Sequence, residues 1–255
     1  MTQSERRAEL IGRLAQERRE TLTVPAGEQA QKRLLRALLN VRPPLPADEA
    51  FLRVQDAYLQ EEIRRKGMTD PRDLTPAGPG AYLWQGDITT LRCDAIVNAA
   101  NSALLGCFCP NHGCIDNAIH TFAGVQLRLA CAELMQRQGH DEPPGRAKIT
   151  PAFNLPCRYV IHTVGPVVDG GLTGRHCALL ASCYRSCLEL ADRAGLRSIA
   201  FCCISTGEFR FPHDRAAAIA ITTVREYREQ TQSGIQVIWN VFKDEDCRIY
   251  RELLG

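Results

Sequence analysis

The sequence predicts an α/β fold, in which a largely parallel, buried sheet has helices on both faces and a small helical extension precedes it. Two observations lead to this prediction. The first 75 of the 255 residues carry apolar side chains at helical spacing, whereas the rest alternates short apolar runs with helical stretches. A Pro/Gly-rich seam at residues 75–80 separates the two parts. We therefore expect an extension at 1–75 and an α/β domain at 76–255.

The extension is expected to contain three helices. Apolar residues recur at helical spacing around Leu10, around Leu34 and through 48–66, and the Pro-rich segment 42–46 ends the second of these stretches. This part contains no Cys and no His. Because each helix has one apolar stripe that needs a cover, we expect a packing or partner surface here rather than a catalytic one.

Five apolar runs in the second part are expected to be strands: Ala81–Trp84, Ala95–Val97, Tyr159–Ile161, Ser198–Ile204 and Ile235–Trp239. Helical stretches are expected at 176–194, 214–229 and 244–254. Strands separated by helices of this length indicate a mostly parallel sheet. In such sheets ligands bind beyond the carboxyl ends of the strands, so the loops that leave those ends are the candidate site.

Composition excludes several classes of protein. A formal net charge of +2 argues against a nucleic-acid binder held by a general basic field. No apolar run approaches the roughly 18 residues that span a bilayer, and the N-terminus lacks the apolar region of a secretory signal. We expect a cytoplasmic protein without membrane or nucleic-acid partners. Its twelve cysteines then indicate metal binding, catalysis or burial rather than disulfides.

The segment 106–114 is the most informative in the chain. It places Cys107, Cys109, His112 and Cys114 within eight residues, and thiolate and imidazole are the ligands that zinc prefers. Since all candidates come from one arc, a site with three protein ligands and an open position is expected, which is the catalytic pattern. The alternative is that Cys109 closes the coordination sphere and makes the zinc structural.

Three further polar features follow expected strands. The amides of Asn98 and Asn101 can hydrogen-bond a ligand, or they form an ordinary turn. The hydroxyl pair and glycine of 205–207 suit a phosphate, which backbone N–H groups and a helix N-terminus would bind. Asp116 lies near the start of a helix, where it is either an N-cap or a carboxylate that activates water.

Three motifs in the right order over residues 80–255 resemble the macrodomain family, which binds ADP-ribose: Gln85–Thr89, Asn98–Asn101 and Ser205–Phe209. Many macrodomains have a glycine-rich loop where this chain has the Cys/His-rich segment. That departure resembles the zinc-containing subclass of protein-ADP-ribose hydrolases, which also carry a helical N-terminal extension. The resemblance implies a three-layer α/β/α macrodomain with a mostly parallel mixed sheet.

The resemblance also implies roles for individual residues in ligand binding. Asp87 would accept a hydrogen bond from the adenine amino group beside the Ile88 backbone, and Phe242 would stack on the adenine unless it packs in the core. Asn101, with Asn98 in the same motif, would orient the distal ribose. The diphosphate would be wrapped by Ser205, Thr206, Gly207, Glu208 and Phe209.

The same resemblance assigns the chemistry. Cys107, His112 and Cys114 match the zinc ligands of the subclass, whereas Cys109 stands where an apolar residue is expected. Asp116 matches the catalytic carboxylate, and Asn101 is its partner at the ribose.

The expected reaction is zinc-dependent removal of mono-ADP-ribose from protein Asp and Glu side chains. The expected partners are therefore the modified protein, the ADP-ribose product and, since the subclass is often encoded beside one, a sirtuin-type ADP-ribosyltransferase. A reader of ADP-ribose without catalysis and an O-acetyl-ADP-ribose deacetylase are the alternatives.

Overall fold

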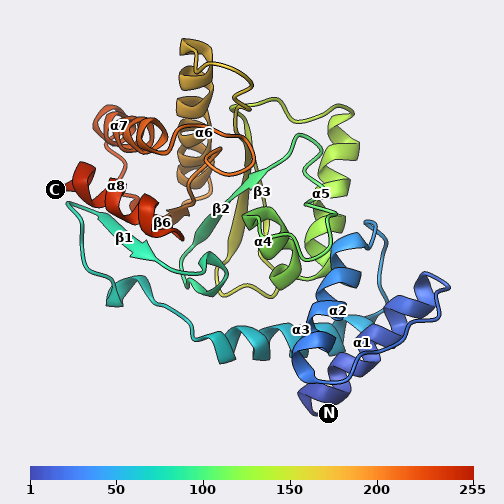
Figure 1. The fold of residues 1–255 in the computed structure, drawn as a ribbon. Coiled ribbons are helices and arrows are strands. Elements are labelled where there is room, and N and C mark those ends of the chain that lie inside the picture. The colour runs from blue at the N-terminus through green and yellow to red at the C-terminus, as the bar shows by residue number, and fades with distance from the viewer.

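The computed structural model describes residues 1–255 and contains eight α-helices, two 3-10 helices and six strands (Figure 1). In chain order the elements are α1 (Gln3–Glu17), α2 (Glu28–Val41), α3 (Glu49–Lys66), η1 (Pro71–Asp73), β1 (Ala81–Gln85), η2 (Ile88–Thr90), β2 (Ala95–Ala100), α4 (Ile115–Ala123), α5 (Val125–Gln138), β3 (Ala147–Pro151), β4 (Tyr159–Val164), α6 (Gly174–Arg193), β5 (Ser198–Phe201), α7 (His213–Thr231), β6 (Gln236–Val241) and α8 (Asp244–Leu254).

The six strands form one sheet in the order β1-β6-β5-β2-β4-β3. Five strands are parallel, and β3 runs antiparallel to β4 at one edge. Helices α6, α7 and α8 cover one face, while α4 and α5 cover the other (Figure 1). The predicted α/β/α architecture with a mostly parallel mixed sheet is therefore confirmed.

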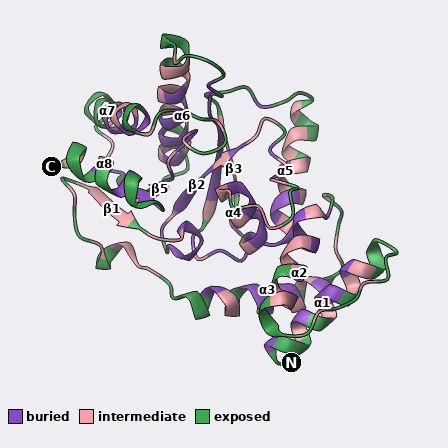
Figure 2. Cartoon of the chain, viewed as in Figure 1, coloured by how far each residue is buried: buried purple, intermediate pink, exposed green.

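The core lies between the sheet and both helical layers. Strands β2, β4, β5 and β6 are buried along most of their length, in keeping with a parallel sheet covered on both faces (Figure 2). The rings of Tyr184, Phe201 and Trp239 pack together between α6 and the sheet. Cys183 and Cys187 of α6 are fully buried there, so burial, one of the three expected uses of the cysteines, accounts for these two.

Strand β3, helix α5 and the two 3-10 helices were not predicted, and each of the five predicted strands ends one to three residues away from the expected position. Strand β3 occupies the sheet edge and is only half-buried, so its sequence lacks a full apolar run. Helix α5 buries Arg128 beside its apolar residues, which weakens the helical pattern. Strand β2 continues to Ala100, so Asn98 lies inside the strand, and β5 already ends at Phe201.

The N-terminal helices share their core with the rest of the chain. Helices α1, α2 and α3 surround their own apolar cluster, which includes Val125 at the start of α5, and Ile63 of α3 belongs to the main core. The Gln55 side chain accepts a hydrogen bond from the Val125 amide at 3.0 Å and donates one to Gln126 at 2.8 Å. The helical extension is therefore packed as part of the same folded unit.

None of the helices combines the length and the apolar character that a bilayer crossing requires.

Candidate active site

The carboxyl ends of the parallel strands bring distant segments of the chain to one edge of the sheet. Gln85 and Val241 are paired in the register of β1 and β6, so the residues that follow them lie side by side. Phe242 comes directly after β6 and is 76% exposed, which shows that the core-packing alternative for this residue is wrong. Its ring is free to stack on a planar ligand.

Asp87 lies at the same edge, just after β1. It caps η2, accepting hydrogen bonds from the Thr89 amide and hydroxyl at 3.0 and 2.6 Å, and it forms an ion pair with Lys66 at 2.7 Å. Burial opposes the charge of Asp87, but the Lys66 ammonium and the Thr89 hydrogen bonds outweigh it and hold the pKa below its ordinary value. Asp87 is thus an ionised acceptor, and the side chain of its neighbour Ile88 points into the core.

The loop after β5 has unbonded backbone amides. The N–H groups of Gly207, Glu208 and Phe209 make no hydrogen bond within the protein and are free to bind an anion. Ser205 adopts a left-handed φ of 67°, and its buried hydroxyl has no partner. A Cβ at Gly165 would lie 2.0 Å from that hydroxyl, so the close approach of the two loops requires glycine there.

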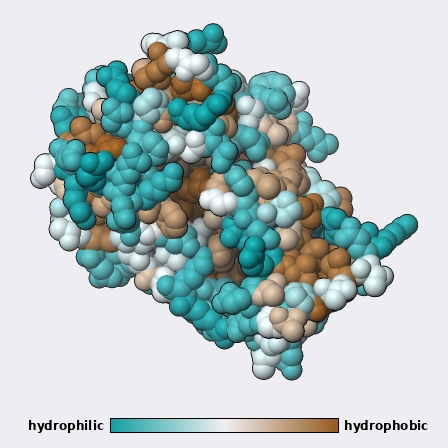
Figure 3. Space-filling model, in the orientation of Figure 1, coloured by the Kyte–Doolittle hydropathy of each residue, from teal (hydrophilic) through white to brown (hydrophobic).

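Thr206 fixes the beginning of this loop, because its hydroxyl donates to the Cys203 carbonyl at 3.0 Å. The Phe209 carbonyl accepts from the Val168 amide at 2.9 Å, which ties the loop to the segment after β4. Phe209 also borders a pocket of about 320 Å³ that includes Val164 and Gly165. In Figure 3, hydrophobic surface lies in a hollow near the middle of the molecule, surrounded by hydrophilic side chains.

Asn101 begins the loop that leaves β2. Its amide donates to the Gly106 carbonyl at 3.2 Å, and its oxygen accepts from the Ala103 amide at 3.1 Å. The side chain therefore shapes the turn that leads to Cys107, at the edge where the expected ligand segments meet.

Asn98 does not occupy the position that the sequence predicted. It lies inside β2 and is fully buried, and its amide donates to Asp116 Oδ1 at 2.8 Å and contacts His162 Nδ1 at 3.1 Å. Because parallel strands present alternate residues to opposite faces, Asn98 faces α4 rather than the loop edge. Its role in this structure is to orient Asp116, not to contact a ligand.

Asp116 is buried in the first turn of α4. Burial raises the pKa of its carboxyl to about 6, against the hydrogen bond from Asn98 and the charge of Arg128. The N-cap of the helix is Cys114, whose sulfur accepts from the Asn117 amide at 3.4 Å, so the alternative that Asp116 is the cap is wrong. A buried carboxyl with a raised pKa is a typical general base.

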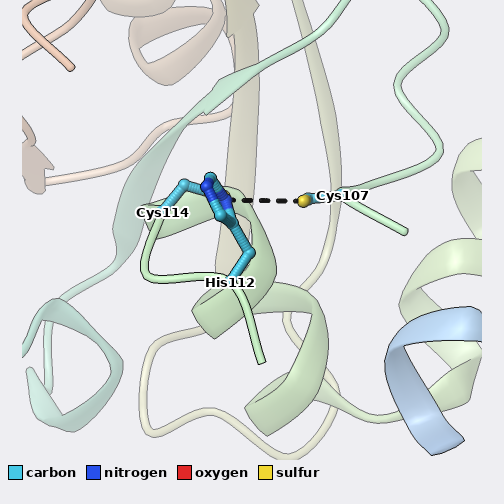
Figure 4. Close-up of side chains that lie close together, drawn as sticks. All are labelled: Cys107, His112 and Cys114. Carbon is cyan, nitrogen blue, oxygen red and sulfur yellow. Dashed lines mark hydrogen bonds between the residues drawn. The ribbon is translucent and has the colours of Figure 1, made fainter. Parts of the chain in front are cut away.

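The structure brings Cys107, His112 and Cys114 together. Their ligand atoms all lie within 4.8 Å of one another, and Figure 4 shows the Cys107 thiol directed at the His112 ring, with Sγ 3.7 Å from Nδ1. Ligands of a tetrahedral zinc ion at 2.0–2.3 Å lie roughly 3.5 Å apart, so this spacing fits zinc. Cys109 is exposed and lies outside the group, which favours the three-ligand alternative.

The surroundings of Cys114 disfavour ionisation of its thiol. Burial, and after it the adjacent Cys107, raises the pKa of the Cys114 thiol to about 12, against the hydrogen bond from Asn117. A metal ligand must be the thiolate, and a bound cation supplies the charge that stabilises it. These residues can therefore hold a divalent metal.

Sequence reasoning missed one contact between two residues that it had named, and it missed the buried histidines beside Asp116. His112 Nε2 lies 3.5 Å from Glu208, so a residue expected at the diphosphate contacts the nitrogen of His112 that faces away from Cys107. His120 Nε2 lies 3.5 Å from Asp116, and burial lowers the pKa of this imidazole well below its ordinary value. The signals for the buried histidines were weak: His120 stands four residues after Asp116, and His162 interrupts an apolar strand.

Comparison with known proteins agrees with this geometry. The sequence profile described as Macro domain matches residues 97–220. The Protein-ADP-ribose hydrolase of Treponema medium is 56% identical and aligns over 100% of both chains. The Protein-ADP-ribose hydrolase of Staphylococcus aureus (strain MRSA252) is 51% identical, covering 95% of this chain and 92% of its own.

A larger relative and two solved structures extend the comparison. A probable bifunctional ADP-ribose hydrolase/ADP-ribosyltransferase of Fusarium oxysporum f. sp. cubense is 43% identical over 87% of this chain and 40% of its own. The Trypanosoma brucei macrodomain in complex with ADP-ribose matches with a TM-score of 0.66 and 30% identity, covering 86% of this chain and 95% of its own. The Oceanobacillus iheyensis macrodomain with ADP matches with a TM-score of 0.63 and 37% identity, covering 71% and 93%.

Proposed function

Because the chain belongs to the macro domain family, we propose that it removes mono-ADP-ribose from aspartate and glutamate side chains of modified proteins, with zinc as its cofactor. The enzyme class rests on relatives named Protein-ADP-ribose hydrolase, which are 51% and 56% identical over nearly the whole chain. The protein is accordingly a protein-ADP-ribose hydrolase. The linkage that it cleaves and the need for zinc are the proposal.

The order of the strands is the observation that carries the placement of the ligand. Across the sheet, β1 and β6 present Asp87 and Phe242, β5 presents the free amides of 207–209, and β2 presents Asn101. ADP-ribose has the same order of parts: adenosine, diphosphate, distal ribose. We therefore place the adenine at Asp87 and Phe242, the diphosphate at the amides, and the ribose beside Asn101.

Zinc would be held by Cys107, His112 and Cys114, whose spacing suits tetrahedral coordination. Three protein ligands would leave one position open, and zinc held there would supply the charge that lowers the pKa of a bound water or hydroxyl. Glu208 beside His112 Nε2 would hold the imidazole so that Nδ1 points at the metal.

The remaining chemistry is assigned to Asp116. Its Oδ1 accepts the hydrogen bond from Asn98, while its Oδ2 makes no hydrogen bond within the protein. Oδ2 would take the proton from the attacking water, and hydrolysis would release ADP-ribose and the free protein carboxylate. Binding of the adenosine and the diphosphate far from the reacting bond would fix the ribose in place.

Two alternatives remain for the test. A non-catalytic reader needs the same ligand pocket, but it has no use for a carboxylate whose burial opposes its charge. An O-acetyl-ADP-ribose deacetylase would act on a small ester in the same pocket. Supply of the substrate by a sirtuin-type ADP-ribosyltransferase is part of the proposal, and the relative named as bifunctional hydrolase/ADP-ribosyltransferase supports a pairing of the two activities.

The test is incubation with a protein that carries ADP-ribose on Asp or Glu, with and without a zinc chelator. We expect release of ADP-ribose in the absence of chelator and none in its presence. Equal release in both would contradict the zinc requirement, and binding without release would identify a reader. A serine-linked substrate and O-acetyl-ADP-ribose, assayed in parallel, establish whether the Asp/Glu ester is preferred.

A further inference from the structure

We propose that Arg36 and Asn40 of the N-terminal extension are positioning residues of the metal site, which hold the loop 107–114 in the conformation that binds zinc. This inference rests on the proposed role of zinc. It assigns a function to the extension, which the sequence predicts only as a packing or partner surface. Both residues lie on α2, whose contact with α4 places it against the start of that helix.

Arg36 joins the loop to helix α4. Its Nη2 donates to the backbone carbonyl of His112 at 3.0 Å, and its Nε and Nη2 donate to Asn117 Oδ1 at 3.1 and 2.7 Å. One planar guanidinium thereby fixes the backbone of a metal-binding residue to the first turns of α4. Lysine has a single donor group and lacks this fork.

Asn117 transmits that contact to the other side of the loop. This residue is fully buried, and its Nδ2 donates to the Cys109 carbonyl at 3.0 Å and to the Cys107 carbonyl at 3.5 Å. Its backbone amide donates to Cys114 Sγ at 3.4 Å. Asn117, whose side chain Arg36 binds, therefore contacts Cys107 through its side chain and Cys114 through its backbone amide.

Asn40 holds the tip of the loop. Its Oδ1 accepts from the Asn111 amide at 2.9 Å, and its Nδ2 donates to the Thr121 hydroxyl at 2.9 Å. Asn111 adopts a left-handed φ of 55°, a turn conformation that asparagine tolerates better than other non-glycine residues. Asn40 fixes this residue directly before His112.

These contacts matter because the loop carries all three metal ligands. A flexible loop loses conformational freedom when it binds a metal, and this loss weakens the affinity. With Arg36 and Asn40 in place, the loop is already ordered before the metal binds. Mutation of residues that orient metal ligands typically lowers the metal affinity by 10- to 100-fold.

The experiment compares Arg36→Ala with Arg33→Ala. Arg33 lies one turn earlier on the same helix, is exposed and makes no hydrogen bond or ion pair, so it controls for the loss of charge and of helix surface. Each zinc-loaded protein is mixed with a chromogenic chelator, and the rate of zinc release is recorded. We expect about a 10-fold or greater acceleration for Arg36→Ala and the wild-type rate for Arg33→Ala. ADP-ribose affinity should be unchanged in both variants.

A second pair of variants separates positioning from charge and from misfolding. Arg36→Lys keeps the charge but loses the fork, and it should release zinc nearly as fast as Arg36→Ala. Asn40→Ala should also accelerate release, and it serves as the test if Arg36→Ala does not fold. Equal release rates for these variants and Arg33→Ala would overturn the inference. A wild-type protein that retains no zinc would instead refute the proposed cofactor, so the two failures are distinguishable.

Discussion

At the scale of single residues, the proposed chemistry depends on the pair Asn98 and Asp116. Asn98 donates to Asp116 Oδ1 and leaves Oδ2 without a partner, so one oxygen is fixed while the other can accept a proton. The hydrogen bond between Asn98 and His162 holds the amide in turn. The carboxylate is therefore oriented by a buried chain of polar groups that begins inside the sheet.

Asp116→Asn keeps the shape and the hydrogen bond from Asn98 but removes the base. We expect hydrolysis to fall by roughly 100-fold or more, because general-base catalysis contributes 10²- to 10⁴-fold. The affinity for ADP-ribose should change little, since the expected binding contacts lie at other strands. Single-turnover release and calorimetric titration measure the two quantities. Unimpaired hydrolysis in this variant would remove Asp116 from the mechanism.

At the scale of elements, the sequence predicts the core strands and most of the long helices, but it does not predict the edge strand β3. Buried parallel strands such as β6 read as continuous apolar runs, and each is visible in the sequence. Strand β3 lies at the edge, where only part of its surface is covered, and it has no such signature. The end of β2 is also invisible, because the polar Asn98 inside it is paired by residues from α4 and β4.

The register of β1 and β6 gives a test of the adenine site. Phe242→Ala should weaken ADP-ribose binding by roughly 5- to 150-fold, because stacking of a base on an aromatic ring contributes about 1–3 kcal/mol. Its free energy of unfolding should stay within about 0.5 kcal/mol of the wild-type value, since the ring is 76% exposed. Phe153→Ala is the matched control, because Phe153 is 39% exposed and follows β3 at the opposite end of the sheet. Equal affinities for the two variants would exclude stacking on Phe242.

At the scale of the whole molecule, polar groups are buried along the boundary between the sheet and α4. His162 is fully buried and is satisfied by Asn98 on one nitrogen and by the Thr150 hydroxyl, 2.9 Å away, on the other. Burial lowers its pKa from 6.5 to about 4, so the folded protein keeps this imidazole neutral. The stability of the entire fold therefore depends on pH.

The sign of this dependence follows from the lowered pKa. Below pH 6.5 the unfolded chain binds a proton at His162 that the folded chain does not bind until about pH 4. The contribution to stability is thus complete above pH 6.5 and is lost as the pH falls toward 4, by about 3 kcal/mol. Denaturant unfolding at a series of pH values should show a smaller acid loss in His162→Gln than in wild type. Identical profiles would contradict this assignment.

The sequence by itself determined the fold class, the candidate ligand motifs and the cluster of Cys and His side chains that could hold a metal. These are local properties, since apolar periodicity and the grouping of Cys and His are readable within a few residues. The tertiary structure alone decided which segments are neighbours. In the chain the segments at Asp87, Asn101, Ser205 and Phe242 follow in that order, but the sheet order β1-β6-β5-β2 rearranges them to match the parts of ADP-ribose. The contact of Arg36 with the loop 107–114 and the start of α4 had no sequence signal either. Its hydrogen bonds join residues that are 76 and 81 positions apart in the chain, so they depend on packing and not on local pattern.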